Sequence, residues 1–268
     1  MPFASVDDIN IYYEIHGSGD PLVLINGLGY DLWMWHKMLP DLADHFQVIV
    51  FDNRGAGRSD KPTGPYNVQM LADDLTGLLA ALDIKRAAVM GHSMGGFVAQ
   101  ALILSQPKLV DKLILSATNF GGPNHIPVTR EALAVLMDMQ ADPIERLRRG
   151  IAISCAPGFA EANPEFAEAW VAHRVKNPLD PQGYQAQLAV GLSLSTVEAS
   201  FEPRLKNVKA PTLILFGEHD KVVPPGNAEL LARGISGSQT RILEDAGHFF
   251  PLEVPDAANR IIIDFLKT

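Results

Sequence analysis

The chain is nearly free of cysteine and has no long apolar run. Cys155 is the only cysteine among 268 residues, which rules out an intrachain disulfide and a cysteine-based metal cluster. No apolar stretch approaches the ~20 residues needed to cross a bilayer. The first eight residues lack the basic start and apolar run of a signal peptide. We therefore expect a cytoplasmic protein that does not use the membrane.

Positive charge is also scarce. The 22 Lys and Arg residues face 31 Asp and Glu residues, giving a net charge of −9, which argues against binding to nucleic acid or to anionic lipid. Hydrophobic residues make up 47% of the chain, an ordinary globular share. A chain of this length builds a core without disulfides or metals. The sequence predicts no cofactor and a small-molecule partner, and it leaves open whether the chain forms homo-oligomers.

Short apolar segments alternate with helical patterns along most of the chain. Eight segments are typical of strands, the first two as an antiparallel hairpin: Phe3–Val6, Ile9–Ile15, Leu22–Ile25, Gln47–Phe51, Ala87–Met90, Lys112–Leu115, Thr212–Phe216 and Thr240–Leu243. Helical patterns lie between and after them: Asp31–His45, Val68–Leu82, Met94–Ser105, Asn227–Ile235 and Ala257–Leu266. This alternation predicts an α/β fold with a mostly parallel, twisted, eight-stranded sheet flanked by helices.

The alternation stops between about Gly121 and Pro203. That stretch contains only helical patterns, punctuated by proline and glycine: Thr129–Gln140, Pro143–Ile153, Asn163–Val175 and Pro181–Leu194. Ordinary crossover helices would require intervening strands, and none is evident. We therefore expect an all-helical cap at 122–204, inserted after the sixth strand into a core formed by 1–121 and 205–268.

The strongest catalytic motif is Gly-His-Ser-Met-Gly at 91–95, between an apolar strand and an apolar helix. A serine at the apex of such a sharp turn projects its hydroxyl outward, and the flanking glycines leave room where strand and helix pass closely. The spacing predicts Ser93 as a nucleophile. Met94 begins the helix, so its backbone N–H is free to stabilise an oxyanion.

A serine nucleophile needs a base and an orienting acid. His248 follows the last predicted strand, and Asp220 follows the strand before it. Loops at the carboxyl ends of parallel strands gather at one edge of the sheet, where Ser93 is also expected. Asp220 is the favoured acid, with Glu218 and Asp245 as alternatives. The chain order is then nucleophile, acid, histidine.

A glycine-containing turn after the strand at 22–25 supplies a candidate for the second oxyanion donor, the backbone N–H of Leu28. Trp33, Phe97 and Phe249 are candidate walls of the substrate pocket, although packing roles explain them equally well. The charged, glycine-rich loop at 52–60 is not followed by a phosphate-binding helix. Three of its residues are expected to brace the loop and not to catalyse: Asp52, Arg54 and Ser59.

Taken together, five motifs resemble the α/β-hydrolase superfamily, specifically its small capped carboxylesterases, 3-oxoadipate enol-lactonases and non-metal haloperoxidase-like members. They are Asn-Gly-Leu-Gly at 26–29, Asp-x-Arg-Gly-x-Gly-x-Ser at 52–59, Gly-His-Ser-Met-Gly-Gly at 91–96, Gly-Glu-His-Asp at 217–220 and Ala-Gly-His-Phe at 246–249. The resemblance implies a cap that selects the acyl group and chemistry without a cofactor. One position departs from the family pattern: Asn26 stands where the family usually has histidine.

The sequence therefore predicts hydrolysis of a carboxylic ester or lactone through an acyl-enzyme. Carbon–carbon bond hydrolysis and perhydrolase or haloperoxidase-type activity at the same triad are the alternatives. A non-catalytic ligand receptor on the same fold is a further alternative from another class.

Overall fold

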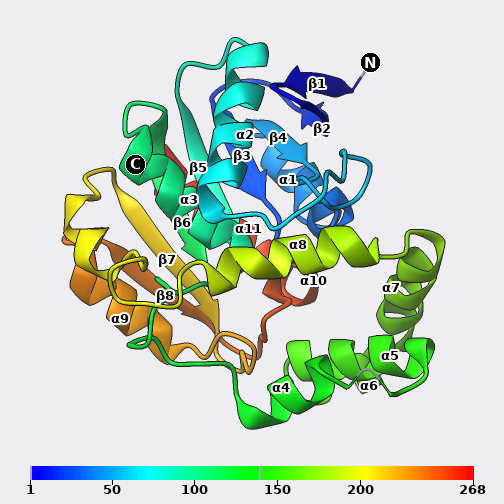
Figure 1. Ribbon diagram of the computed structural model, residues 1–268. Helices are drawn as coiled ribbons and strands as arrows, with labels where there is room; N and C mark the ends of the chain where they lie inside the picture. Colours follow the sequence, from blue (N-terminus) through cyan, green and yellow to red (C-terminus); the bar gives the residue numbers. More distant parts are fainter. Residues whose placement is uncertain (1, 139) are drawn as a thin grey trace.

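The computed structural model describes residues 2–138 and 140–268 and is built on a single eight-stranded sheet (Figure 1). Its strands are β1 Phe3–Val6, β2 Ile9–His16, β3 Pro21–Ile25, β4 Gln47–Phe51, β5 Ala87–His92, β6 Val110–Ser116, β7 Thr212–Gly217 and β8 Gln239–Leu243. They lie in the order β1-β2-β4-β3-β5-β6-β7-β8. The pairings of β2 with β1 and β4 are antiparallel, and all the other pairings are parallel. The predicted fold class is confirmed.

Alternate side chains of the central strands face two separate apolar layers. The α-helices outside the stretch between β6 and β7 are α1 Leu39–Ala43, α2 Val68–Ala81, α3 Met94–Ser105, α9 Gly226–Gly234, α10 Phe250–Glu253 and α11 Pro255–Lys267, with the 3-10 helix η1 Leu32–Trp35 before α1. In β3, Val23 and Ile25 belong to the layer that includes α2, α3 and α9, whereas Leu22 and Leu24 belong to the layer that includes α1 and α11. In the described part of the chain, no helix has the length and apolar character that a membrane crossing requires.

The single helix predicted at Asp31–His45 is wrong. The structure has η1 and then α1, with a break between them. Pro40 explains the break, because it has no backbone N–H to donate to the preceding turn and is accepted only near the start of a new helix. The Asp31 side chain caps η1 by accepting a hydrogen bond of 3.1 Å from the backbone N–H of Trp33.

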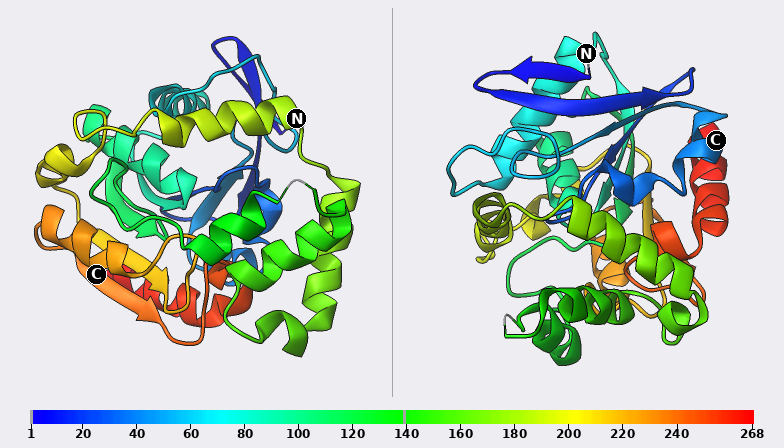
Figure 2. Two further views of the ribbon diagram at one scale, coloured as in Figure 1. Left: turned by 60° about the horizontal axis from the view of Figure 1, so that its bottom comes forward. Right: turned by 90° about the vertical axis from the view of Figure 1, so that its right-hand side faces the viewer.

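Five α-helices, followed by the 3-10 helix η2 Glu202–Asn207, lie between β6 and β7 in the described part of the chain: α4 Arg130–Leu136, α5 Pro143–Ser154, α6 Phe159–Ala162, α7 Pro164–Lys176 and α8 Pro181–Leu192. No strand occurs there among the described residues, and the predicted helix to Gln140 ends earlier, with residue 139 outside the described part. Helices α4 to α7 lie together at one end of the molecule, and α8 lies between them and the sheet (Figures 1 and 2). The division of the chain into a core and a 122–204 cap domain stays a prediction.

Candidate active site

Ser93 occupies a strained turn between β5 and α3. Its φ of 55° and ψ of −120° lie in a region that non-glycine residues rarely adopt, and such strain is typical of functional sites. The Ser93 backbone N–H donates to the Ser116 carbonyl at 2.9 Å, which fastens the turn to β6. A Cβ on Gly91 would overlap the carbonyl oxygen of Gly95. The motif glycines are therefore required by the close approach of β5 and α3, as the sequence predicts.

His248 and Asp220 meet beside this turn. The His248 Nδ1 lies 2.8 Å from Asp220 Oδ2, and both side chains are almost completely buried. Asp220 Oδ1 accepts hydrogen bonds from the backbone N–H groups of Val222 at 2.8 Å and Val223 at 2.7 Å. Because a carboxylate only accepts, the bond to Asp220 requires a proton on His248 Nδ1. In the neutral ring Nε2 is then an acceptor, which is the tautomer a general base needs.

The two alternative acids lie away from this pair. Glu218 and Asp245 both lie near His219, with nitrogen–oxygen distances of 3.7 and 4.0 Å, and their carboxylates are exposed. A carboxylate oxygen of each acid and a ring nitrogen of His219 all lie within 4.8 Å of one another, close enough to bind one metal ion together. Among the described residues this is the only group of three such side chains. Exposed acidic residues often gather in this way without an ion, and we assign none.

His92, directly before Ser93 in the chain, lies next to the His248 ring. Its ring centroid is 4.9 Å from that of His248, and its Nδ1 lies 2.8 Å from Ser116 Oγ. Complete burial, assisted by the nearby His248, holds the pKa of His92 well below its ordinary value, so this ring stays neutral. Its Nε2 has no partner among the described residues. His92 therefore packs against the base without adding charge to the site.

Glu253 in α10 supports the loop that carries His248. Its carboxylate accepts hydrogen bonds from the backbone N–H groups of Gly247 at 3.0 Å and Ala156 at 2.7 Å. Burial raises the pKa of Glu253 to about 7, and the negative charge of Asp220 adds to the rise. Sequence reasoning missed this residue, because a glutamate in a Pro-Leu-Glu helix carries no signal that its side chain turns inward.

A cavity of about 250 Å³ opens at Ser93. Leu28, Met94 and Phe97 line it, so both candidate oxyanion donors and one candidate pocket wall lie on the same cavity as the serine. As the first residue of α3, Met94 has a backbone N–H with no acceptor inside the helix. The other two candidate walls lie elsewhere: Trp33 lines a different cleft, and Phe249 is buried with its ring centroid 6.2 Å from that of His248.

The turn at 26–29 is held by a side chain from α8. Gln187 Oε1 accepts a 2.8 Å hydrogen bond from the Gly29 backbone N–H, and Gln187 Nε2 donates to the Arg54 carbonyl at 2.7 Å. This buried amide therefore ties the turn to the loop after β4. The sequence offers no signal for it, since glutamine on an amphipathic helix is ordinarily exposed.

Asn26, the departure from the family pattern, lies buried at the start of the same turn. Its Nδ2 donates to the Phe51 carbonyl at 2.9 Å, while its Oδ1 has no partner among the described residues. The amide thus supplies a donor that holds β3 against the end of β4. The backbone turn that carries Leu28 is supported on this side by Asn26 and on the other by Gln187.

The expectation that the 52–60 loop is a bracing network is confirmed. Asp52 accepts hydrogen bonds of 2.8 Å from the backbone N–H groups of Leu32 and Arg58. Ser59 Oγ donates to the Asp52 carbonyl at 2.6 Å. The guanidinium of Arg54 forms a two-bond ion pair with the Asp74 carboxylate in α2. None of these groups lines the cavity at Ser93.

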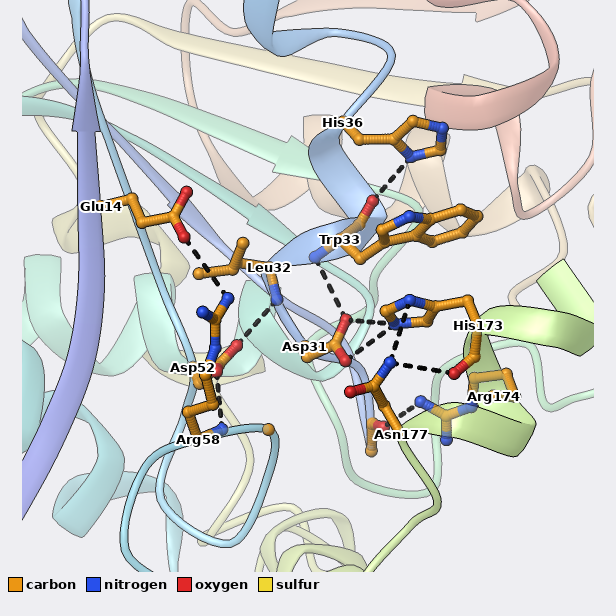
Figure 3. Close-up of polar contacts among 12 residues, drawn as sticks. Glu14, Asp31, Leu32, Trp33, His36, Asp52, Arg58, His173, Arg174 and Asn177 are labelled. Carbon is orange, nitrogen blue, oxygen red and sulfur yellow. Dashed lines mark hydrogen bonds and ion pairs between the residues drawn. The ribbon is translucent and has the colours of Figure 1, made fainter. Parts of the chain in front are cut away.

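A second, larger cleft of about 1170 Å³ lies between η1, the 52–60 loop and the connection from α7 to α8 (Figure 3). There the Trp33 indole is stacked between His36 and His173, with ring centroids 4.0 and 4.5 Å away. His173 Nε2 lies 2.9 Å from Asp31 Oδ2. Arg174 Nη1 donates to the Gly29 carbonyl at 3.2 Å. Ser93, Asp220 and His248 do not line this cleft.

The fold and the serine turn define an α/β hydrolase. Residues 20–255 match the family described as the alpha/beta hydrolase fold, which is most of the chain, and the protein belongs to that family. The resemblance drawn from the five motifs is thereby confirmed at the level of the superfamily.

Relatives that match along almost the full chain carry different hydrolase names. The chain is 28% identical to a protein of Azorhizobium caulinodans named as a carbamate hydrolase, over 99% of this chain and 98% of the relative. It is 30% identical to a 2-hydroxy-6-oxononadienedioate/2-hydroxy-6-oxononatrienedioate hydrolase of Pseudomonas putida, over 97% and 92%. The crystal structure of the enol-lactonase from Burkholderia xenovorans LB400 superimposes with a TM-score of 0.83 at 28% identity, and each chain is covered completely. These relatives establish a hydrolase and leave the cleaved bond undefined.

Proposed function

We propose that this protein is a serine hydrolase that cleaves a carboxylic ester or lactone through an acyl-enzyme on Ser93. The observation that carries the proposal is the 2.8 Å bond between His248 and Asp220, with the His248 ring 4.9 Å from the ring of His92, the residue directly before a serine held at a positive φ. His248 is the base and Asp220 is the acid that orients it. A small-molecule ester or lactone is the substrate, and no cofactor takes part.

The proposed reaction consists of two proton transfers through His248 and the stabilisation of one oxyanion. His248 Nε2 takes the Ser93 hydroxyl proton as the oxygen attacks the carbonyl carbon, and the backbone N–H groups of Leu28 and Met94 stabilise the tetrahedral oxyanion. The imidazolium, stabilised by Asp220, then gives its proton to the leaving alcohol oxygen as that bond breaks. Water repeats the sequence on the acyl-enzyme, which releases the acid and restores Ser93.

The helical segment at 122–204 serves in this proposal as the cap over the site. Helix α8 contributes the Gln187 side chain that holds the 26–29 turn, and it also forms part of the wall of the cavity at Ser93. Both contributions support this role. The cap would thus select the acyl group while also fixing one face of the oxyanion hole.

Replacement of Ser93 by alanine tests the proposal. Ser93→Ala is expected to abolish hydrolysis of chromogenic esters and labelling by an organophosphonate, while Ser105→Ala, at the far end of the same helix, retains both. A folded Ser93→Ala protein that still turns over would refute the assignment.

Carbon–carbon bond hydrolysis at the same triad is the second candidate. It is favoured by the 30% identity to the Pseudomonas putida hydrolase, whose named substrate is an oxo-dienedioate. Turnover of a vinylogous diketone at a higher kcat/KM than any simple ester or lactone would decide for this candidate. Release of a peracid from an ester in the presence of peroxide would instead indicate perhydrolase activity.

A further inference from the structure

The cavity at Ser93 has mostly apolar walls. Among the described residues no lysine or arginine lines it, and its apolar side chains come from the 26–29 turn, α3, α8 and the loops after β6 and β7: Leu28, Met94, Phe97, Val128, Leu188, Val222 and Val223. A carboxylate held among these side chains would find no cation to pair with. Burying an unpaired charge in such surroundings is strongly unfavourable.

Most polar side chains of the cavity are already engaged. Asn119 Oδ1 accepts from the Gly121 backbone N–H at 2.7 Å, and the remaining Nδ2 of this amide is a neutral donor and not a cation. Thr118 Oγ1 donates to the Ser93 carbonyl at 2.8 Å, and both polar atoms of Gln187 are bonded to backbone groups. His125 Nδ1 lies 2.6 Å from the Gly122 carbonyl, which only accepts, so the proton is on Nδ1. In the neutral ring Nε2 is then an acceptor, and an acceptor does not bind a carboxylate.

Arg174 is a buried cation bonded to the 26–29 turn, but it faces the larger cleft. Arg174 donates to the Gly29 carbonyl and lies against the rings of Tyr30 and Trp170, at 5.7 and 5.9 Å from their centroids. It lies among the residues of the larger cleft (Figure 3). It does not line the cavity at Ser93. Its charge is therefore not presented to an acyl group lying in that cavity.

From these walls we infer that the acyl group of the substrate is small, apolar and uncharged, an inference that rests on the proposed function. The cavity volume of about 250 Å³ lies below the roughly 300–1,000 Å³ of sites for drug-sized ligands. The Pseudomonas putida relative is named for dioate substrates, which carry two carboxylates. By this inference the present protein differs from that relative in the charge of the substrate it accepts.

Two isosteric esters test the inference. The mono-4-nitrophenyl ester of adipic acid ends in a carboxylate, and 4-nitrophenyl 6-methylheptanoate replaces that carboxylate with an isopropyl group of the same shape. Assays at pH 8 keep histidine side chains ordinarily neutral. We expect kcat/KM for the neutral ester to exceed that for the charged ester by on the order of 100-fold, because only the charged ester must bury an unpaired carboxylate.

A cation placed in the cavity wall provides the matched variant. Leu188 lines the cavity from α8 and is 41% exposed, so a longer side chain has room to adjust. Leu188→Arg is expected to lower the preference for the neutral ester about tenfold, since it supplies the missing partner for the carboxylate. Leu188→Met, which is long but neutral, should leave the preference unchanged.

The outcomes separate this inference from the proposed function. An equal or higher kcat/KM for the charged ester in the unmodified protein would overturn the inference alone, and loss of that activity in Arg174→Met would identify Arg174 as the carboxylate partner. Turnover of neither ester, together with no organophosphonate labelling of Ser93, would overturn the proposed function and this inference with it. A neutral preference that Leu188→Arg lowers and Leu188→Met does not would support it.

Discussion

The carboxyl edge of the sheet and the helical segment above it hold their residues in different ways. At the sheet edge, Ser93 is fixed by a strained backbone and Asp220 by two backbone N–H groups and His248. The helical segment reaches the core through scattered backbone hydrogen bonds, such as the 3.0 Å bond from the Phe249 N–H to the Ser154 carbonyl. Its side chains add further contacts, chiefly Gln187 with the 26–29 turn and His173 with Asp31. In the proposed mechanism, backbone geometry at the sheet edge therefore sets the chemistry, whereas α8 supports the 26–29 turn and lines part of the cavity at Ser93.

The largest effect on catalysis is expected from replacing Asp220, the acid at the sheet edge. In Asp220→Asn the amide oxygen can keep the bonds from Val222 and Val223, but the amide nitrogen then faces His248 Nδ1 and favours the wrong tautomer. We expect kcat to fall by about 10⁴-fold with the fold retained. Steady-state kinetics and circular dichroism measure the two quantities. A loss of less than about tenfold would show that His248 does not depend on Asp220.

A pH-dependent effect on stability is expected from Glu253, whose carboxylate accepts a hydrogen bond from Gly247, next to His248. Its pKa of about 7 in the folded protein lies above its ordinary value of 4.5. Between these values the folded state keeps a proton that the unfolded state releases. The free energy of unfolding therefore falls as pH rises from about 4.5 to 7, by up to about 3 kcal/mol.

Glu253→Gln imitates the protonated side chain and should remove this loss. Urea unfolding at pH 5 and pH 8 is expected to show a smaller difference between the two pH values in the variant than in the unmodified protein. Glu229→Gln, at an exposed position in α9, serves as the matched control. Identical pH dependence in all three proteins would contradict the raised pKa of Glu253.

A smaller effect is expected where α8 meets the sheet edge. Gln187→Leu leaves the Gly29 N–H and the Arg54 carbonyl without their partner, and the 26–29 turn loses its support. We expect kcat for ester hydrolysis to fall about tenfold, with little change in KM, because the loss falls mainly on oxyanion stabilisation. Gln185→Leu, on an exposed position of the same helix, should change neither. An unchanged kcat in Gln187→Leu would separate α8 from the oxyanion hole.

The smallest effect is expected at the outer contact of α7. His173→Gln keeps a donor for Asp31 but loses the stacking on Trp33. We expect a loss of about 1 kcal/mol in the free energy of unfolding and an unchanged kcat. Chemical denaturation and ester assays give both values. A fall in kcat similar to that in Gln187→Leu would show that the contacts of α7 also reach the chemistry.

The difference between the sheet edge and the helical segment also determines which features can be predicted from the sequence. Strands of the sheet and the Gly-His-Ser-Met-Gly turn are legible because local patterns dictate them: apolar runs form covered strands, and glycines mark the close approach at Ser93. The proposed partners Asp220 and His248 follow from their places after consecutive strands. The helix predicted at Asp31–His45 was wrong because its apolar spacing outweighed the effect of Pro40.

Residues that act through distant contacts leave no local pattern. Gln187 lies 158 residues from its partner Gly29, and Glu253 lies 97 residues from Ala156. Each is a polar residue on an otherwise ordinary helix, and only the packing of that helix directs the side chain inward. The larger cleft around Trp33 likewise depends on where α7 packs against η1, and the sequence of α7 does not specify that position.

The most direct test of the serine mechanism is the mass of the protein during turnover. Acid quenching of the reaction with a slowly hydrolysed ester, followed by intact-mass and peptide mass spectrometry, should reveal one added acyl group on the peptide that contains Ser93, and no such group in Ser93→Ala. An acyl group on another residue, or steady turnover by Ser93→Ala with no adduct at all, would contradict the account.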